Sequence, residues 1–498
     1  MTSGRGLYTV EEVRRIEQAA LATAPHGALM RRAGAAAAAA AVRLLPDGGR
    51  VLALAGPGNN GGDALEAAAL LAYQGWAVTV RFCGNAAALP ADAAAALARA
   101  QASPAVFQPA DPAAGWDLVI DGLFGIGLAR PITGELAALV SAVNRLSCPV
   151  LALDVPSGLD ADTGAVVGLG GVAVRASHTV TFIAEKPGLH TADGRDCAGA
   201  VELATLQVDP ALYPPPHSLL GEVWLFAGAL RPRRQNSHKG SFGDVGILGG
   251  AHGMAGAAVL AARTAAMSGA GRVYAGFIAE PPAFDAMHPE IMCRRAAELD
   301  LARAALVAGP GLGTSAEAHA LLADALASPA PLVLDADALN MVAADDQLHQ
   351  ALASRAGATL MTPHPLEAAR LLACGAAEIQ ADRLHAARRL AAACNAMVVL
   401  KGSGSVIARP DGLAVVNPTG NPALASAGTG DVLAGLCGAL LAQHWTPWQA
   451  ALGAVWLHGA AADLLVDQGI GPVGLVASEL ASAIRISLNR LIRSQAAA

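Results

Sequence analysis

The chain has 498 residues, of which 54% are hydrophobic and 15% charged, and its formal net charge is -7. This length allows about two to four domains, and the hydrophobic content is enough to build large cores. The net negative charge gives no overall basic field for binding nucleic acid. The seven cysteines are scattered, with no C-x-x-C pair, so neither a disulfide framework nor a zinc site is indicated.

The sequence shows no pattern typical of a signal peptide or a membrane span. The first residues contain no apolar signal-peptide core, and the apolar run near 432–442 is shorter than the ~20 residues that a membrane span needs. We therefore expect a cytoplasmic protein without a membrane partner, and we also expect a homo-oligomer.

The first 217 residues alternate between strand and helix patterns. A helix is predicted over residues 9–22. Strands are predicted at 51–55, 77–82, 118–125, 150–158 and 178–184, with alanine-rich helical segments between them. This alternation predicts an α/β domain in which helices cover both faces of a parallel sheet, a Rossmann-like three-layer arrangement.

A proline run at 214–216 lies in a stretch without helix or strand periodicity and predicts a linker. A second α/β domain is expected over 222–498. Its strands are predicted at 244–250, 304–313, 331–340, 358–365, 396–408 and 412–417, followed by a helical tail over 431–490.

The segment GPGNNGGD begins at Gly56 and contains the pattern G-x-G-x-x-G. An ordinary dinucleotide-binding turn also needs an acidic residue ~20 positions further on, and none follows the next predicted strand. The glycines can still bring backbone amides close to phosphate oxygens at a helix N-terminus. The alternative is a tight strand-to-helix turn capped by Asp63.

Three polar side chains follow predicted strands of this block. Asn60, Asp121 and Ser157 can converge as oxygen ligands of a small cation, because ligands of open parallel sheets lie beyond the carboxyl ends of the strands. Asp154 remains as a candidate acid or base. The alternative for Asp154 is an Asx turn before Pro156.

Together, GPGNNGGD, DGLFGIGL and DVPSGLDADTG resemble the NAD(P)H-hydrate epimerase domain. The resemblance implies that Asp154 is catalytic and that K⁺ is bound by Asn60, Asp121 and Ser157. It implies that two segments hold the hydrated dinucleotide: Asn59, Asn60, Gly61, Gly62 and Asp63, and the loop Gly125, Ile126, Gly127, Leu128, Ala129, Arg130 and Pro131. Ala64 departs from the family, which usually has glycine there, and its methyl group can narrow the pocket or be harmless.

In the second block, Gly428-Thr429-Gly430-Asp431 stands directly before an apolar helix. Amides at such a helix N-terminus can hold a phosphoryl group while the carboxylate acts as a base towards a substrate hydroxyl. The alternative is a helix N-cap with permissive glycines. No G-x-x-x-x-G-K-[ST] pattern occurs, which excludes a P-loop.

The G-T-G-D motif resembles the ribokinase-like superfamily, and SHKGSFGDVGILGG, AGPGLG, LDADALN, TPHPLE and LKGSGSVI narrow the resemblance to ADP-dependent NAD(P)H-hydrate dehydratases. The resemblance implies that Asp431 is catalytic and that ADP is a co-substrate with Mg²⁺. The residues implied to contact the nucleotide are Lys401, Gly402, Ser403, Gly404, Ser405 and Gly430, and those implied to contact the hydrate are Ala257, Gly313, His364 and Asp431. His364 has an alternative role as a turn residue between prolines, and Leu366 and Ala423 replace glycines usual in the family.

We therefore expect an enzyme that epimerises hydrated NADH and NADPH at C6 and dehydrates the S form with ADP, leaving AMP and phosphate. The alternative enzyme is a ribokinase-like kinase of a small vitamin-type alcohol, fused to a nucleotide-binding domain. A non-catalytic scaffold is a third hypothesis. The presence of Asn60, Asp121, Asp154 and Ser157 argues against it.

Overall fold

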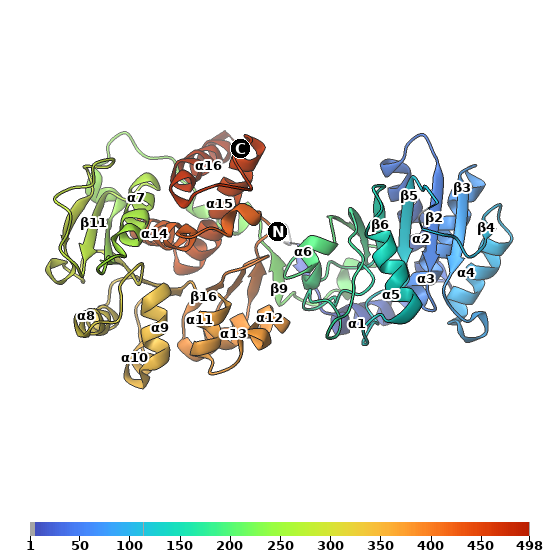
Figure 1. The fold of residues 1–498 in the computed structure, drawn as a ribbon, viewed down its shortest axis with the longest axis horizontal. Coiled ribbons are helices and arrows are strands. Elements are labelled where there is room, and N and C mark those ends of the chain that lie inside the picture. Colours follow the sequence, from blue (N-terminus) through green and yellow to red (C-terminus); the bar gives the residue numbers. More distant parts are fainter. Residues whose placement is uncertain (1–4, 113, 498) are drawn as a thin grey trace. The chain divides into compact units, whose positions relative to one another are not determined.

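The computed structural model describes residues 5–112 and 114–497, and the chain divides into two compact units between Leu219 and Leu220. Both units are α/β folds built on largely parallel sheets, which confirms the predicted fold class (Figure 1). We describe each unit by itself.

The N-terminal unit contains a seven-stranded sheet in the order β4-β3-β2-β5-β6-β7-β8, and all of its pairings are parallel. The strands are β2 (Arg50–Ala55), β3 (Ala77–Phe82), β4 (Val106–Phe107), β5 (Leu118–Gly122), β6 (Val150–Leu153), β7 (His178–Phe182) and β8 (Ala200–Ala204). The short strands β1 (Gly6–Leu7) and β9 (Ser218–Leu220) pair antiparallel with each other.

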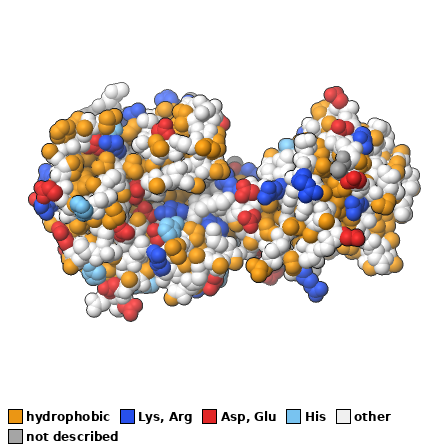
Figure 2. Space-filling model, viewed as in Figure 1, with side chains coloured by type: hydrophobic (Ala, Val, Ile, Leu, Met, Phe, Trp, Pro, Cys, Tyr) orange, Lys and Arg blue, Asp and Glu red, His pale blue; other side chains and the backbone are white. Residues whose placement is uncertain are grey.

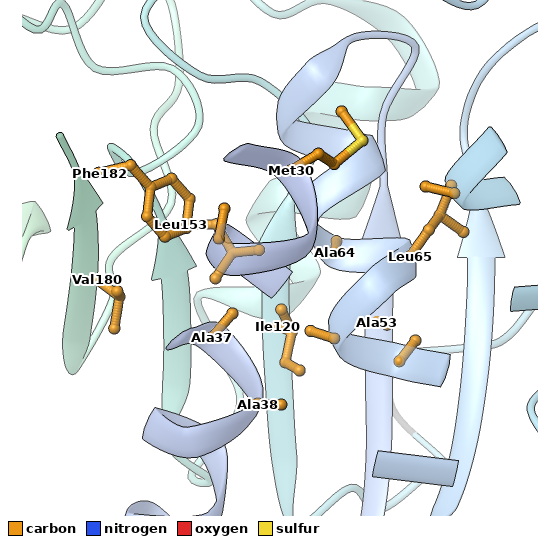
Figure 3. Close-up of a cluster of buried hydrophobic side chains, with 14 of the residues drawn as sticks. Met30, Ala37, Ala38, Ala53, Ala64, Leu65, Ile120, Leu153, Val180 and Phe182 are labelled. Atoms are coloured by element: carbon orange, nitrogen blue, oxygen red, sulfur yellow. The ribbon is translucent and has the colours of Figure 1, made fainter. Parts of the chain in front are cut away.

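Helices cover both faces of this sheet, as the continuous apolar strands require. The helices are α1 (Val10–Leu21), α2 (Ala28–Leu44), α3 (Asn59–Tyr73), α4 (Ala91–Gln101), α5 (Gly134–Val143) and α6 (Gly194–Cys197). Helices α1 to α4 share one core cluster with alternate strand residues such as Ala53 and Ile120 (Figure 3). Helix α5 packs with Leu52, Leu54 and Val119 in a second cluster, which uses the other strand residues.

The C-terminal unit has the strand order β18-β17-β16-β15-β14-β13-β10-β11-β12. Pairing is parallel from β12 to β16 and antiparallel in β16-β17-β18. The strands are β10 (Asp244–Gly249), β11 (Arg272–Phe277), β12 (Met292–Arg295), β13 (Ala305–Ala308), β14 (Leu332–Leu334), β15 (Thr359–Met361), β16 (Met397–Leu400), β17 (Val406–Ala408) and β18 (Ala414–Val416).

Two groups of helices cover the second sheet. In the first group, helices α7, α14 and α15 pack against β10, β11, β13 and β16. In the second group, α8 and α13 pack against β13, β16 and β17 (Figure 1). The helices are α7 (Ala255–Met267), α8 (Ala316–Ala327), α9 (Ala336–Ala344), α10 (Asp346–Ala353), α11 (Pro365–Leu371), α12 (Ala376–Ala381), α13 (Arg383–Cys394), α14 (Thr429–Ala442), α15 (Pro447–Asp467) and α16 (Ala477–Ala497).

Three expectations from the sequence differ in detail. The segment 331–340 is only partly a strand, because β14 ends at Leu334 and α9 begins at Ala336. The segment 396–408 is a hairpin of β16 and β17, turned by the glycine-rich loop between them. The helical tail is three helices, and α15 is long and apolar enough to cross a membrane. Of its most apolar stretch, 67% is buried within the protein, as in the core helix of a globular domain.

Candidate active sites

A cavity of about 640 Å³ lies in the N-terminal unit, beyond the carboxyl ends of β2, β5 and β6. Of the residues predicted to bind the dinucleotide or to act on it, Asn59, Asn60, Asp63, Asp154 and the loop 125–130 line this cavity. Gly61, Gly62, Pro131, Asp121 and Ser157 are not among the lining residues. The structure thus brings the catalytic candidate and most of the predicted binding residues to one cavity.

The glycines at the start of α3 serve close packing. A Cβ atom on Gly61 would lie 2.0 Å from the carbonyl oxygen of Gly56, and one on Gly62 would lie 2.7 Å from the sulfur of Met30. The first turn of α3 therefore sits directly on the preceding turn and on α2. This contact fixes the N-terminus of α3, with Gly58, Asn59 and Asn60, at the cavity.

Asp154 is held from one side by buried donors. Its Oδ1 accepts hydrogen bonds from Lys186 Nζ and from the backbone N–H of Phe182, the latter at 3.2 Å. Lys186 is completely buried and also donates to Thr181 Oγ1 and the Phe182 carbonyl, each at 2.8 Å. Because the hydrogen bonds that Asp154 accepts from the described residues all fall on Oδ1, the other oxygen of this cavity-lining carboxylate stays available to a ligand.

The backbone of Asp154 is also unusual. Its φ of 64° lies in the left-handed region, which non-glycine residues other than Asn and Asp rarely adopt. The Asx-turn alternative is not the observed arrangement, because the carboxylate bonds to Lys186 and Phe182 on and after β7. The backbone turn aims the side chain across the sheet edge and away from its own loop.

Two further carboxyl groups line the same cavity. Burial, together with the charge of Asp154, raises the pKa of Glu17 on α1. The same two causes raise the pKa of Asp63 well above its usual range, and Glu17 and Glu66 add to the effect. The cavity therefore holds one carboxylate fixed by a lysine and two carboxyl groups that protonate more readily than usual.

Asp121 and Ser157 form a closed, fully buried pair. Ser157 Oγ and its backbone N–H donate to the two oxygens of Asp121 at 2.7 and 2.9 Å, and burial raises the pKa of Asp121. Asn60 differs, because both its side-chain amide atoms are buried without a hydrogen-bond partner in the described part of the chain. Buried polar atoms of this kind need a partner.

In the C-terminal unit, Gly428 adopts a left-handed φ of 86° and α14 begins at Thr429, so that Asp431 lies in the first turn of this helix. Burial, together with the charges of Asp335 and Asp337, raises the pKa of Asp431 to about 6, against the lowering effect of Lys401. Asp431 therefore belongs to a charged cluster that the sequence alone did not assemble.

Lys401 is the centre of this cluster. Its Nζ donates to Asp335 Oδ1 at 2.7 Å and lies 4.0 Å from Glu367 Oε2. The carboxylates raise the pKa of Lys401 against the effect of burial. A Cβ atom built on Gly430 would lie 3.4 Å from this Nζ, which places Lys401 beside the first turn of α14. The predicted lysine and the predicted helix N-terminus are therefore neighbours.

The loop from Lys401 to Ser405 turns back on itself between β16 and β17. Ser405 Oγ donates to the Gly402 carbonyl at 3.2 Å and accepts from the Gly402 N–H at 3.3 Å. Beneath the loop, the buried guanidinium of Arg383 donates to the carbonyls of Leu400 and Lys401, each at 3.2 Å. Arg383 thus fixes the base of the loop that carries Lys401.

His364 is the N-cap residue of α11. Its Nδ1 accepts from the backbone N–H groups of Leu366 and Glu367 at 3.1 and 3.2 Å, so this atom carries no proton. Burial and the charge of Lys401 lower the pKa of His364. The turn role that the sequence left open is therefore present, and Nε2 remains as the ring atom with a hydrogen.

Ala257 and Gly313 lie at a neighbouring loop. Gly313 has a left-handed φ of 71°, and its N–H donates to Asp337 at 2.8 Å. A Cβ atom on Gly311 would lie 3.2 Å from Ala257 Cβ, so the start of α7 contacts this loop. Since Asp337 acts on the pKa of Asp431, these residues adjoin the same charged cluster.

The three departures from the family pattern fall in different surroundings. Ala64 is fully buried and faces the sheet, where a Cβ on Gly122 would lie 2.5 Å from it, and it does not line the cavity. Its methyl group therefore fills core space and does not narrow the pocket. Leu366 is 47% exposed, whereas Ala423 is buried.

Several residues of these sites received no role from sequence reasoning, among them Glu17, Lys186, Asp335, Asp337, Glu367 and Arg383. The scarcity of lysine was a usable signal for Lys186, because the chain contains only Lys186, Lys239 and Lys401. Arg383 gave no signal, since nothing in the sequence separates a buried arginine from the many exposed ones.

Two family models match the chain, one in each unit. Residues 245–485 match the family model described as NAD(P)H-hydrate dehydratase, and residues 26–188 match the model described as YjeF-related protein N-terminus. A protein of Coxiella burnetii named bifunctional NAD(P)H-hydrate repair enzyme Nnr is 36% identical, covering 97% of this chain and 99% of its own length. The Escherichia coli protein of the same name is 38% identical, covering 93% and 89%.

Among solved structures, an ADP/ATP-dependent NAD(P)H-hydrate dehydratase from Bacillus subtilis, co-crystallised with ATP and Mg²⁺, is 33% identical. It covers 53% of this chain and 96% of its own, with a TM-score of 0.47.

Proposed function

This chain belongs to the family of bifunctional NAD(P)H-hydrate repair enzymes, and we propose from that premise how its two units divide the work. The N-terminal unit interconverts the R and S hydrates of NADH and NADPH at C6. The C-terminal unit dehydrates the S form with ADP, which leaves AMP and phosphate. The observation that carries the proposal is that each unit places one acid, Asp154 or Asp431, at the edge of its sheet beside a lysine.

Epimerisation needs only proton transfers. The C6 hydroxyl gives its proton to the free oxygen of Asp154, the bond from C6 to the ring nitrogen breaks, and the nitrogen takes a proton. Rotation and reclosure from the other face return both protons. Lys186 holds the Asp154 carboxyl group in place for the first transfer, and the protonated form of Glu17 or Asp63 can supply the second.

We propose that Asn60, Asp121 and Ser157 hold K⁺. The fit rests on the buried amide of Asn60, whose oxygen lacks a partner, and on the adjacent supply of carboxylate and hydroxyl oxygen from the Asp121–Ser157 pair. When bound, the cation supplies positive charge near the N-terminus of α3. The chain's own contribution is to position this N-terminus for the substrate phosphates.

Dehydration needs a better leaving group than hydroxide. Asp431 takes the proton of the C6 hydroxyl group. The oxygen of that hydroxyl group attacks the terminal phosphoryl group of ADP, and AMP leaves. Phosphate then leaves C6 as C5 loses a proton, which restores the ring double bond. Lys401 and the first turn of α14 face the charge on the transferring group.

We propose Mg²⁺ as a partner of the nucleotide phosphates, in keeping with the ATP and Mg²⁺ used for the Bacillus subtilis structure. In the described residues no three His, Cys, Asp or Glu side chains gather as a metal-binding group. The phosphates would therefore have to provide most of the ligands, as Mg²⁺ commonly accepts.

The deciding experiment incubates the enzyme with mixed hydrate epimers and with ADP or ATP while the absorbance of the reduced ring is followed. Full conversion of both epimers supports both activities. A stable phosphoester without recovery of absorbance would favour the small-alcohol kinase. Cytoplasmic location and a homo-oligomeric state remain predictions, and size measurement by light scattering tests the second.

A further inference from the structure

A second cavity, of about 630 Å³, lies within the C-terminal unit and is not part of the dehydratase site. Leu440 and Gln443 line it, at the end of α14 opposite Asp431. A helix of 14 residues spans about 20 Å. The cavity is therefore about one helix length away from the charged cluster around Lys401.

The lining is strongly basic. It contains Arg231, Arg233, Arg234 and Arg485 but no aspartate or glutamate. Across the described residues, none of these four arginines has a carboxylate within ion-pair distance, whereas Arg263 and Arg272 of the same unit pair with Asp285 and Asp244. On the face shown in Figure 2, acidic and basic side chains are interspersed, so four uncompensated arginines at one cavity are a local feature.

One arginine is already held in place. The Arg233 guanidinium lies 3.6 Å from the ring centre of Phe242 and donates to the Gly269 carbonyl and to Gln443 Oε1, at 2.5 and 3.2 Å. Gly269 follows the C-terminus of α7, so the positive charge of Arg233 also interacts favourably with the negative end of the helix dipole. The position of Arg233 is therefore explained by contacts within the protein. In contrast, the side chains of Arg234 and Arg485 make no hydrogen bond within the described residues.

The rest of the lining is mixed. Apolar walls come from Met267, Leu440, Trp445, Leu488 and Ile492, and hydrogen-bonding groups come from Asn236, Ser237, Ser241 and Asn489. The volume is within the range of small-molecule sites, roughly 300 to 1,000 Å³. Guanidinium groups recognise phosphate through paired hydrogen bonds. Apolar and aromatic walls accept the flat face of a ring.

We propose that this cavity is a second ligand site, which binds a nucleoside diphosphate or a similar phosphate-bearing nucleoside. The phosphates lie against Arg234 and Arg485, and the ring lies against Trp445 and Leu488. The net charge of -7 and the bounded volume favour such a small anion over nucleic acid. The site is separate from the proposed catalysis and does not depend on it.

The test is equilibrium dialysis of labelled ADP against the full chain at fixed ionic strength. All proteins carry Lys401→Gln, which weakens binding at the dehydratase site. The test variant adds Arg234→Gln and Arg485→Gln. The matched control adds Arg490→Gln and Arg493→Gln, two exposed arginines of α16 that do not line the cavity and that remove the same charge.

We expect the test variant to lose one equivalent of bound ADP per chain, or to bind it about tenfold more weakly, and the control to change less than twofold. Pyrophosphate should displace this equivalent only at higher concentration than ADP, and adenosine should not displace it. If the test variant and the control variant bind ADP equally, the proposal of a second ligand site is wrong. Tighter binding of an oligonucleotide or an acidic peptide than of ADP would overturn the ligand class.

Discussion

Replacing Asp431 by asparagine should abolish dehydration and stabilise the C-terminal unit above pH 6. The pKa of this carboxyl is raised from 3.8 to about 6, mainly by burial, so the folded state holds its proton more tightly than the unfolded state. Stability from this group is complete below pH 3.8 and is lost as pH rises to about 6. Two pKa units correspond to at most about 3 kcal/mol, and partial exposure reduces this to about 1 to 2 kcal/mol.

Urea unfolding at pH 4 and pH 7.5 measures this effect. Trp224, Trp445, Trp448 and Trp456 belong to the C-terminal unit, so tryptophan fluorescence follows mainly that unit. The variant should equal the parent at pH 4 and exceed it at pH 7.5. Its dehydration rate should fall at least about 100-fold, because a base is lost, and epimer exchange should be unchanged.

Two results would refute this reasoning. The first is a variant that is less stable than the parent at pH 7.5, which would mean that Asp431 supports the fold as an ion-pair partner. The second is substantial dehydration by the folded variant, which would remove Asp431 from proton transfer.

Other predictions concern the N-terminal cavity and the loop that carries Lys401. Asp154→Asn should slow epimer exchange at least about 100-fold and spare dehydration, as chromatography of the two epimers would reveal. Lys186→Met should destabilise the N-terminal unit by about 2 to 3 kcal/mol in urea unfolding, since it leaves the half-buried carboxylate of Asp154 without its cation, and adding Asp154→Asn should recover part of the loss. KCl should raise the melting temperature of the parent more than NaCl does, and Asn60→Ala should remove this difference. Arg383→Lys should raise the KM for ADP more than it lowers kcat, because lysine lacks the planar guanidinium that bonds Gln380 through one nitrogen and the carbonyls of Leu400 and Lys401 through the other.

Much of the sheet architecture was readable from the sequence. Strands β2, β5 and β6 are buried apart from Arg50 at the start of β2, and each contains an apolar run, while β3 occupies the predicted residues 77–82. Strand β8 was missed because it lies at the sheet edge, where Ala200–Ala204 is largely exposed and lacks an apolar run. The α9 segment was mistaken for strand because only Asp335 separates the apolar strand β14 from the first residue of α9, with no glycine or proline between them.

Site residues were predictable where a polar residue directly follows a strand. They were much less predictable where the role of a residue depends on an ion pair with a residue distant in the sequence. Asp154 and Asp431 stood out because glycine or proline turns surround them. Their electrostatic partners did not, since Lys186 reaches Asp154 across 32 positions and Lys401 reaches Asp335 across 66. Such pairings depend on tertiary contacts between strand ends, which local patterns do not encode.

The distribution of lysine has a practical consequence. Lys186 is fully buried and Lys401 is bonded to Asp335, whereas Lys239 is exposed. Apart from the α-amino group, an amine-directed fluorophore should therefore attach to one side chain, that of Lys239, three residues beyond the arginine-lined segment 231–236. A single dye at that position would signal occupancy of the neighbouring cavity in real time, without any engineered attachment point.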